Sequence, residues 1–161
     1  MLNLYSYYRS SAAYRVRIVL EYKKIPYKIM PVNLLQSEQL GDNYNAINAQ
    51  QRVPVLVDGE FMLSQSFAII DYLEKVHPEP TVYCRDKQLQ AKVMELSLLV
   101  ACDIHPLNNL SVLNYLNKQL NCGKKKKITW YHHWLKLGFD ALETKLKKVS
   151  DGRFCITGNL T

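Results

Sequence analysis

The first 32 residues read MLNLYSYYRSSAAYRVRIVLEYKKIPYKIMPV, and they decide the class of the fold. Short apolar runs at residues 2–5 and 27–32 predict two strands, and the apolar spacing between them predicts a helix over residues 12–24. A helix that connects two strands of one sheet makes those strands parallel. The chain is therefore predicted to open with a strand, helix, strand unit, and a weaker helix is expected over residues 36–44.

A hairpin and a further helix follow. Val53-Pro-Val-Leu-Val57 and Phe61-Met-Leu63 predict two strands around Asp58-Gly59. This dipeptide favours a tight antiparallel turn, because both central residues of such a turn must tolerate positive φ. Ser66 is suited to cap a helix over residues 67–76.

The second half of the chain has a different hydrophobic pattern from the first. From Asp86 onward the pattern is helical without a clear strand, and it reaches about Leu120 with a break at His105-Pro106. Thr129 is expected to cap another helix that reaches Val149.

The different hydrophobic patterns of the two halves predict two domains. We expect an α/β domain over residues 1–80 and an all-α domain over residues 86–161, with the joint near His77-Pro-Glu-Pro80, because a proline disfavours helical geometry in the residue before it. The final Gly158-Asn-Leu-Thr161 resembles the start of a helix with no helix after it. The all-α domain is therefore expected to be incomplete or truncated.

Composition excludes some classes of protein. The 161 residues are 48% hydrophobic and carry 21 Lys+Arg against 14 Asp+Glu, a formal charge of +7, which is unlike a disordered chain. This basic balance suits nucleic acid or small acidic substrates alike. Apolar runs such as Leu96–Cys102 stop far short of the roughly 18 residues of a membrane span, and arginines interrupt the N-terminal segment where a signal peptide is apolar. We expect no membrane span and a cytoplasmic location.

Three groups of reactive or charged residues are given structural roles. The cysteines are widely spaced without a zinc-like pattern and are expected to be reduced structural thiols. Lys124–Lys127 is most simply a solvated loop between helices. His132 and His133 are adjacent, so on a helix they point about 100° apart and do not form a metal pair.

Three places in the first domain have the features of an anion or peptide site. Ser10-Ser11 precedes the first helix, whose N-terminus has unpaired N–H groups and partial positive charge that stabilise an anion such as a thiolate. Val53-Pro54 begins a strand, so the Val53 backbone can pair with a peptide, and the proline can be cis or trans. Gln65-Ser66 opens a second helix and suits a carboxylate. Capping alone explains each serine, but the combination describes a glutathione site.

Four stretches of this sequence resemble the zeta class of glutathione transferases. They are residues 5–18 (YSYYRSSAAYRVRI), 51–56 (QRVPVL), 64–73 (SQSFAIIDYL) and 103–111 (DIHPLNNLS). The resemblance implies a thioredoxin-like N-terminal domain with an all-helical C-terminal domain, glutathione as cofactor, and a homodimer whose reaction needs no metal. From the hydropathy and residue patterns above we expect no nucleic-acid partner and no membrane contact. It also implies an enzyme that isomerises maleylacetoacetate to fumarylacetoacetate in tyrosine and phenylalanine catabolism.

The resemblance assigns site residues to positions of this chain. Ser10 matches the serine that hydrogen-bonds the glutathione sulfur, and Ser11 and Arg15 are further catalytic candidates. Arg9 is expected to attract or orient the acidic substrate, although a structural ion pair is an equal alternative for both arginines. The other expected glutathione contacts are Ala12, Ala13, Tyr14, Gln39, Val53, a cis Pro54, Gln65, Ser66, His105, Asn109, Leu110 and Ser111.

The chain departs from the family at Ala12, because the family motif usually reads Ser-Ser-Cys. Any contribution of that cysteine thiol to sulfur positioning is therefore absent. The implied reaction is addition of a thiolate to the cis double bond, rotation about the resulting single bond, and elimination that returns glutathione. Two alternatives stay open: a glutathione transferase that conjugates or dehalogenates small electrophilic acids, and a non-catalytic interaction module.

Overall fold

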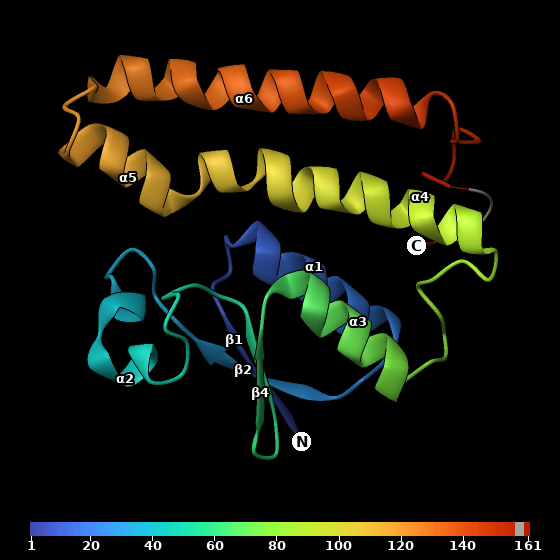
Figure 1. Ribbon diagram of the computed structural model, residues 1–161. Coiled ribbons are helices and arrows are strands. Elements are labelled where there is room, and N and C mark those ends of the chain that lie inside the picture. The colour runs from blue at the N-terminus through green and yellow to red at the C-terminus, as the bar shows by residue number, and fades with distance from the viewer. Residues whose placement is uncertain (157–159) are drawn as a thin grey trace. The chain divides into compact units, whose positions relative to one another are not determined.

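The structure is a computed structural model that describes residues 1–156 and 160–161 (Figure 1). Contacts between residues divide the chain into two compact units, Met1–Val82 and Tyr83–Thr161. Every strand among the described residues belongs to the first unit, and the second unit is helical.

The first unit is built on a four-stranded mixed sheet. Its strands are β1 (Leu2–Ser6), β2 (Tyr27–Pro31), β3 (Val55–Asp58) and β4 (Phe61–Ser64), in the spatial order β2-β1-β3-β4. β1 and β2 are parallel, as the strand, helix, strand prediction requires, and the two other pairs are antiparallel. The predicted thioredoxin-like class of fold is confirmed.

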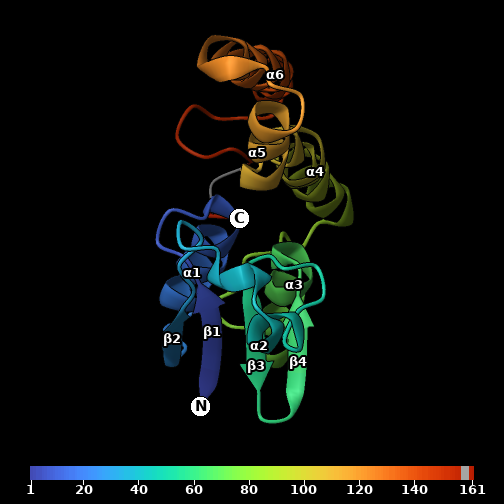
Figure 2. The same cartoon turned by 90° about the vertical axis from the view of Figure 1, so that its left-hand side faces the viewer.

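Two helices cover one face of this sheet. α1 (Ser11–Tyr22) and α3 (Ser66–Val76) lie side by side on that face, and the short α2 (Asp42–Asn45) lies on the other (Figures 1 and 2). The side chains that fill the space between the sheet and the two long helices are fully buried: Leu4, Val16, Leu20, Ile69 and Leu73. On the α2 side, Val32, Tyr44, Val53 and Val55 form a second buried cluster.

Two local predictions for the first unit are wrong in detail. The weaker helix expected over residues 36–44 is two short pieces, the 3₁₀ turn η1 (Glu38–Leu40) and α2, because Gly41 between them is extended with ψ 154°. Asp58 lies in β3 and pairs with Phe61, so the turn residues are Gly59 and Glu60, and only Gly59 has positive φ. That matches a type II′ turn.

The second unit is a pair of helical segments that run antiparallel beside each other (Figure 1). The first segment comprises α4 (Lys87–Leu98), a π-helical stretch η2 (Leu99–Ile104), a 3₁₀ turn η3 (Pro106–Asn108) and α5 (Leu110–Lys118). The second is the single helix α6 (Gly123–Leu146). Asp86 caps α4 as expected, because its carboxylate accepts hydrogen bonds from the N–H groups of Gln88 and Leu89.

Helix boundaries in the second unit differ from the prediction. The interruption expected at His105-Pro106 is present, because a 3₁₀ turn begins at Pro106. The α-helix, however, already ends at Leu98, and from Leu99 onward the N–H groups bond to the carbonyl five residues earlier, as in the π-type bond from His105 N to Val100 O at 2.9 Å. Thr129 is not a helix cap but lies inside α6, where its hydroxyl donates to Lys125 O at 3.1 Å. Lys124–Lys127 is likewise not a loop, because it forms the first turns of α6.

The remaining expectations concern membrane spans, the final residues and the cysteines. The stretch Lys87–Lys118 is long and apolar enough to cross a membrane by length and composition alone, although no uninterrupted apolar run was expected to do so. Only 11% of this window is buried, and a single helix of this kind does not establish a span, so the absence of a membrane span stays a prediction. The helix start expected at residues 158–161 includes 158 and 159, which lie outside the described residues. The four cysteines are free, but Cys102 and Cys155 are exposed rather than buried.

Candidate functional site

The strand register places the three predicted site regions at one edge of the sheet. Tyr5 near the end of β1 pairs with Val55 at the start of β3, and Val55 pairs with Ser64 at the end of β4. The loop that carries Ser10 leaves β1 at this edge, Val53-Pro54 enters β3 there, and Gln65-Ser66 follows β4 there. The sheet therefore brings the loop that carries Ser10 to the same end as Val53 and Gln65, which lie 43 and 55 residues later in the sequence.

Ser10 is the N-cap residue of α1. Its backbone is extended (φ −77°, ψ 113°), and its side-chain oxygen accepts a hydrogen bond from Ala13 N at 3.2 Å. The loop is closed by a bond from Ser10 N to Tyr7 O at 3.0 Å. Because the Ser10 oxygen serves as an acceptor, the hydroxyl proton can be donated to an anion at the positive end of the helix.

The residues around Ser10 differ in their exposure and in whether they already have an interaction partner. Ser11 is the exposed first residue of α1, whereas Ala13 is fully buried and its N–H is already bonded to Ser10. Arg9 is exposed and can reach a ligand in solution, while Arg15 is half-buried and already has an interaction partner. The remaining two predicted contacts are the half-buried Ala12 and the exposed Tyr14.

Arg17 supports the loop before Ser10, and sequence reasoning missed it. Its guanidinium donates to Tyr8 O at 3.1 Å and lies 5.3 Å from the centre of the Tyr14 ring. These contacts join the loop after β1 to the first turns of α1. A basic residue in a helix gives no sequence signal for such a role, because its partner is a backbone carbonyl.

Val53 and Pro54 are joined by a cis peptide bond, as the family resemblance implies. The preceding carbonyl of Arg52 is held by two side chains, Tyr44 Oη at 2.9 Å and Asn48 Nδ2 at 2.8 Å. Burial raises the pKa of Tyr44, so its phenol stays protonated and can donate this bond. Tyr44 and Asn48 were not among the predicted residues, because only the fold brings them to Arg52.

The N-terminus of α3 lacks a side-chain cap. Ser66 is the first helical residue and is buried, so the prediction that it caps the helix is wrong. The N-cap residue is Gln65, held at φ 71° and ψ 113°, and its side chain donates instead to Gln50 Oε1 at 2.8 Å. N–H groups at a helix start without such a cap favour an anion.

Gln39 lies in η1, on the chain that follows β2. β2 ends at the same sheet edge, since Pro31 pairs with Ser6 of β1. The Gln39 Oε1 atom is buried and has no hydrogen-bond partner among the described residues. A buried acceptor without a partner is costly, so the Gln39 amide would gain a hydrogen bond if its side chain turned toward a ligand N–H.

Four predicted residues belong to the second unit and form one local structure. His105 ends the π-helical stretch, and Asn109 is the N-cap of α5. The Asn109 side chain accepts from Ser111 N at 3.1 Å and from Ser111 Oγ at 3.0 Å. Leu110 begins α5 and is 38% exposed.

Two hollows of the second unit involve none of the predicted residues. One, of about 490 Å³, lies along α6, and the other, of about 360 Å³, lies between α5 and α6. His132 and His133 line the first hollow beside Asp140. Among residues 1–156 and 160–161, no group of three or more His, Cys, Asp or Glu side chains is placed to hold a metal ion.

Comparisons with known proteins agree with this geometry. Residues 4–81 match the family model of the glutathione S-transferase N-terminal domain. The chain is 41% identical over 162 residues to the probable maleylacetoacetate isomerase of Vibrio cholerae serotype O1, a match that covers 99% of this chain and 75% of that protein.

Solved structures extend this match to three dimensions. A bacterial maleylpyruvate isomerase of the zeta class, in its holo form, superposes with a TM-score of 0.94 at 38% identity, over 99% of this chain and 76% of that one. The maleylacetoacetate isomerase of Methylobacterium extorquens AM1, solved with malonate and glutathione, has a TM-score of 0.95 at 33% identity, over 99% and 75%. This chain spans about three quarters of the length of these proteins.

The sheet order and the three loops at its edge define a thioredoxin-like domain of the glutathione transferase kind. The similarity to the relatives named above also gives the class of glutathione transferase. The chain belongs to the glutathione S-transferase family, in the zeta class that contains the maleylacetoacetate isomerases.

Proposed function

We propose that this chain binds glutathione at the sheet edge of its first unit and uses it to isomerise maleylacetoacetate to fumarylacetoacetate. The observation that carries the proposal is the position of Ser10, whose hydroxyl caps α1 and has a proton to donate at the positive end of the helix. The names of the relatives support the choice of reaction.

The first unit fits the chemical groups of glutathione. Ser10 would bind the sulfur, the backbone of Val53 would pair with the cysteinyl residue, and Gln65 with Ser66 would hold the γ-glutamyl carboxylate. The unpartnered Gln39 Oε1 would accept an N–H of the tripeptide. We assign residues 1–80 to the glutathione-binding domain and residues 86–161 to the helical domain. The residues of the helical domain that would contact glutathione are His105, Asn109, Leu110 and Ser111.

Glutathione supplies a nucleophilic thiolate that adds reversibly to a conjugated double bond. Because a free thiol has a pKa near 8.5, most of it is protonated at neutral pH. The Ser10 hydroxyl and the N–H groups of α1 therefore have to favour the ionised sulfur, and each unit by which its pKa falls corresponds to about 1.4 kcal/mol. Because residue 12 is alanine, no cysteine thiol at that position assists this ionisation.

The substrate carries carboxylate charge, and we assign its orientation to Arg9. This side chain is exposed beside Ser10, whereas Arg15 is half-buried and already engaged. Arg15, in the first turns of α1, would act on the reacting groups from the position it already holds. Ser11 is the other catalytic candidate in these turns. A guanidinium is suited to a carboxylate because it donates two parallel hydrogen bonds.

We also propose that the chain forms a homodimer in the cytoplasm. Large apolar side chains are exposed on the helices of the second unit, among them Leu98, Tyr115, Leu137 and Phe139. Exposed apolar surface of this kind is typical of an interface between proteins. Light scattering coupled to gel filtration measures the mass in solution, and a mass of 18.7 kDa at micromolar concentration would contradict the dimer.

The test uses the chain with glutathione and maleylacetone, an analogue of the proposed substrate, and follows isomerisation by ultraviolet absorbance. We expect turnover that requires glutathione and falls in Ser10→Ala. The matched control is Asp86→Ala, which removes the cap of α4 and should leave the rate unchanged. Turnover of small halogenated acids but not of maleylacetone would favour the conjugating or dehalogenating alternative. Glutathione binding without any turnover would favour the interaction module.

A further inference from the structure

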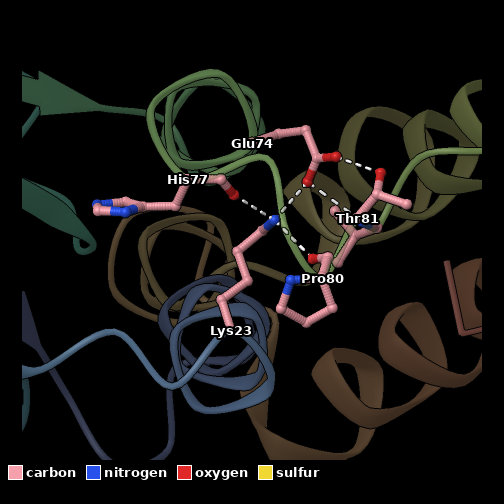
Figure 3. Close-up of polar contacts among 6 residues, drawn as sticks. Lys23, Glu74, His77, Pro80 and Thr81 are labelled. Atoms are coloured by element: carbon pink, nitrogen blue, oxygen red, sulfur yellow. Dashed lines mark hydrogen bonds and ion pairs between the residues drawn. The ribbon is translucent and has the colours of Figure 1, made fainter.

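A buried ion pair joins the carboxyl ends of α1 and α3. Lys23 is the C-cap residue of α1, its side chain is fully buried, and its Nζ lies 2.7 Å from Glu74 Oε2. The same Nζ donates to His77 O at 2.7 Å and to Pro80 O at 2.8 Å (Figure 3). We call this set, completed by Thr81 and Val82, the clasp.

The clasp satisfies its own hydrogen bonds. An ammonium group has three donors, and Lys23 uses them on one carboxylate and two carbonyls. Glu74 accepts from Lys23, from the Thr81 hydroxyl and from Val82 N, the last at 3.1 Å. Burial alone would raise the pKa of Glu74, but these bonds outweigh it and hold that pKa below its usual value. The clasp is therefore complete without a ligand.

Stability is a weak explanation for such a group. Burying two charges carries a large desolvation cost, and apolar side chains of similar volume can often replace a buried ion pair without loss. What an ion pair adds is geometry, because its hydrogen bonds are directional whereas apolar contact is not. The question is which geometry the clasp specifies.

The two helices that the clasp joins both begin at the candidate site. α1 starts after Ser10 and has Lys23 as its C-cap residue, while α3 starts after Gln65 and has His77 as its C-cap residue. Between these ends, the contact of α1 and α3 with the core is apolar, through side chains such as Val16 and Ile69. Apolar packing resists separation more than it resists small displacements along the helix axes.

We propose that Lys23 and Glu74 are positioning residues for glutathione. The clasp fixes how α1 and α3 are placed along one another, and with it the separation of their N-termini, where Ser10 and Gln65 lie. This proposal rests on the glutathione binding proposed above and deepens it. Lys23 and Glu74 do not touch the tripeptide and act only through the two helices.

The main test is the double variant Lys23→Met/Glu74→Leu, measured by thermal unfolding and by calorimetric binding of glutathione. Removing both charges together leaves no unpaired ion. It also leaves the carbonyls of His77 and Pro80 and the N–H of Val82 without their partners, so we expect a lower melting temperature with the first unit still folded at the temperature of the binding measurement. Glutathione should nevertheless bind about tenfold more weakly, because donors displaced by a fraction of an ångström lose their alignment. Thr81→Val is the matched control: it removes one hydrogen bond to residues 77–82 but keeps the Lys23–Glu74 pair, and it should leave the affinity unchanged.

A second pair of variants keeps the proposal testable if the double variant does not fold. Glu74→Gln preserves the shape of the side chain and removes its charge, and Leu2→Ala destabilises the same unit through a buried residue of β1. We expect only Glu74→Gln to weaken glutathione binding.

The outcomes separate the two proposals. Unaltered affinity in the double variant, or equal weakening in Glu74→Gln and Leu2→Ala, would show that the clasp serves stability alone and would overturn the positioning role. An unaltered chain that binds no glutathione at millimolar concentration would instead overturn the proposed function itself.

Discussion

Replacing Gly138 of α6 by alanine should destabilise the second unit by about 2 kcal/mol. A Cβ atom at this position would lie 2.3 Å from Ile104 Cγ1 and 2.7 Å from Ile104 Cδ1. Carbon atoms prefer about 3.5–4.0 Å, so both contacts are strongly repulsive. Ile104 is only 3% exposed and has little room to move away. Overpacking of this severity costs about 3 kcal/mol, and the better helix propensity of alanine returns about 1 kcal/mol.

Urea denaturation followed by far-ultraviolet circular dichroism measures this loss. With a slope of about 2 kcal/mol per molar urea, a loss of about 2 kcal/mol lowers the midpoint of the transition by about 1 M. The slope itself should not change, because the variant buries the same surface when folded.

The Ile104→Ala background separates the clash from every other effect of the substitution. Ile104→Ala removes Cγ1 and Cδ1, and the nearest remaining atom is the Ile104 Cβ at 3.4 Å. Introducing alanine at position 138 should then stabilise the second unit by about 1 kcal/mol through helix propensity alone. The same loss in both backgrounds, or no loss in the unaltered chain, would refute the steric argument.

Three further predictions concern the second unit. The hydrogen bond from Lys145 holds the pKa of Glu95 down at about 2, so its contribution to stability is present above about pH 4.5 and is lost as the pH falls toward 2; the difference in urea midpoint between the unaltered chain and Glu95→Gln should shrink over that range. Trp130→Phe removes the bond from the indole N–H to Leu107 O at 2.8 Å and should cost about 1 kcal/mol in urea denaturation, and a midpoint equal to that of the unaltered chain would contradict this. Asp86→Ala should cost about 1 kcal/mol through the lost cap of α4, whereas Asp86→Asn should cost much less.

The fold could be predicted where local patterns agree with the tertiary structure. The strands of the first unit have clear apolar runs, and a helix between Tyr5 and Tyr27 leaves only a parallel pairing for β1 and β2. The apolar pattern did not predict the helix boundaries that are set by backbone geometry. Extended Gly41 divides a stretch that reads as one helix. The π-helical stretch from Leu99 has the same apolar spacing as an ordinary helix, so no sequence signal marks its start.

The candidate site could be predicted only in part. Ser10 stands out because a serine before an apolar helix is a recognisable cap, and the structure places it as that cap. The bonds that hold Arg52 O come from Tyr44 and Asn48, and two of the three contacts of the Lys23 ammonium are to backbone carbonyls. Interactions of this kind depend on which loops the fold brings together, and no spacing in the sequence encodes them.

The central claim is that the N-terminus of α1 and the Ser10 hydroxyl ionise the sulfur of glutathione. The most direct measurement is a pH titration of the thiolate absorbance of glutathione bound to the chain, repeated with Ser10→Ala. We predict a midpoint at least about one pKa unit below that of free glutathione, equivalent to about 1.4 kcal/mol, and a return toward the free value in Ser10→Ala. Identical midpoints for bound and free glutathione, or for the two proteins, would contradict the account.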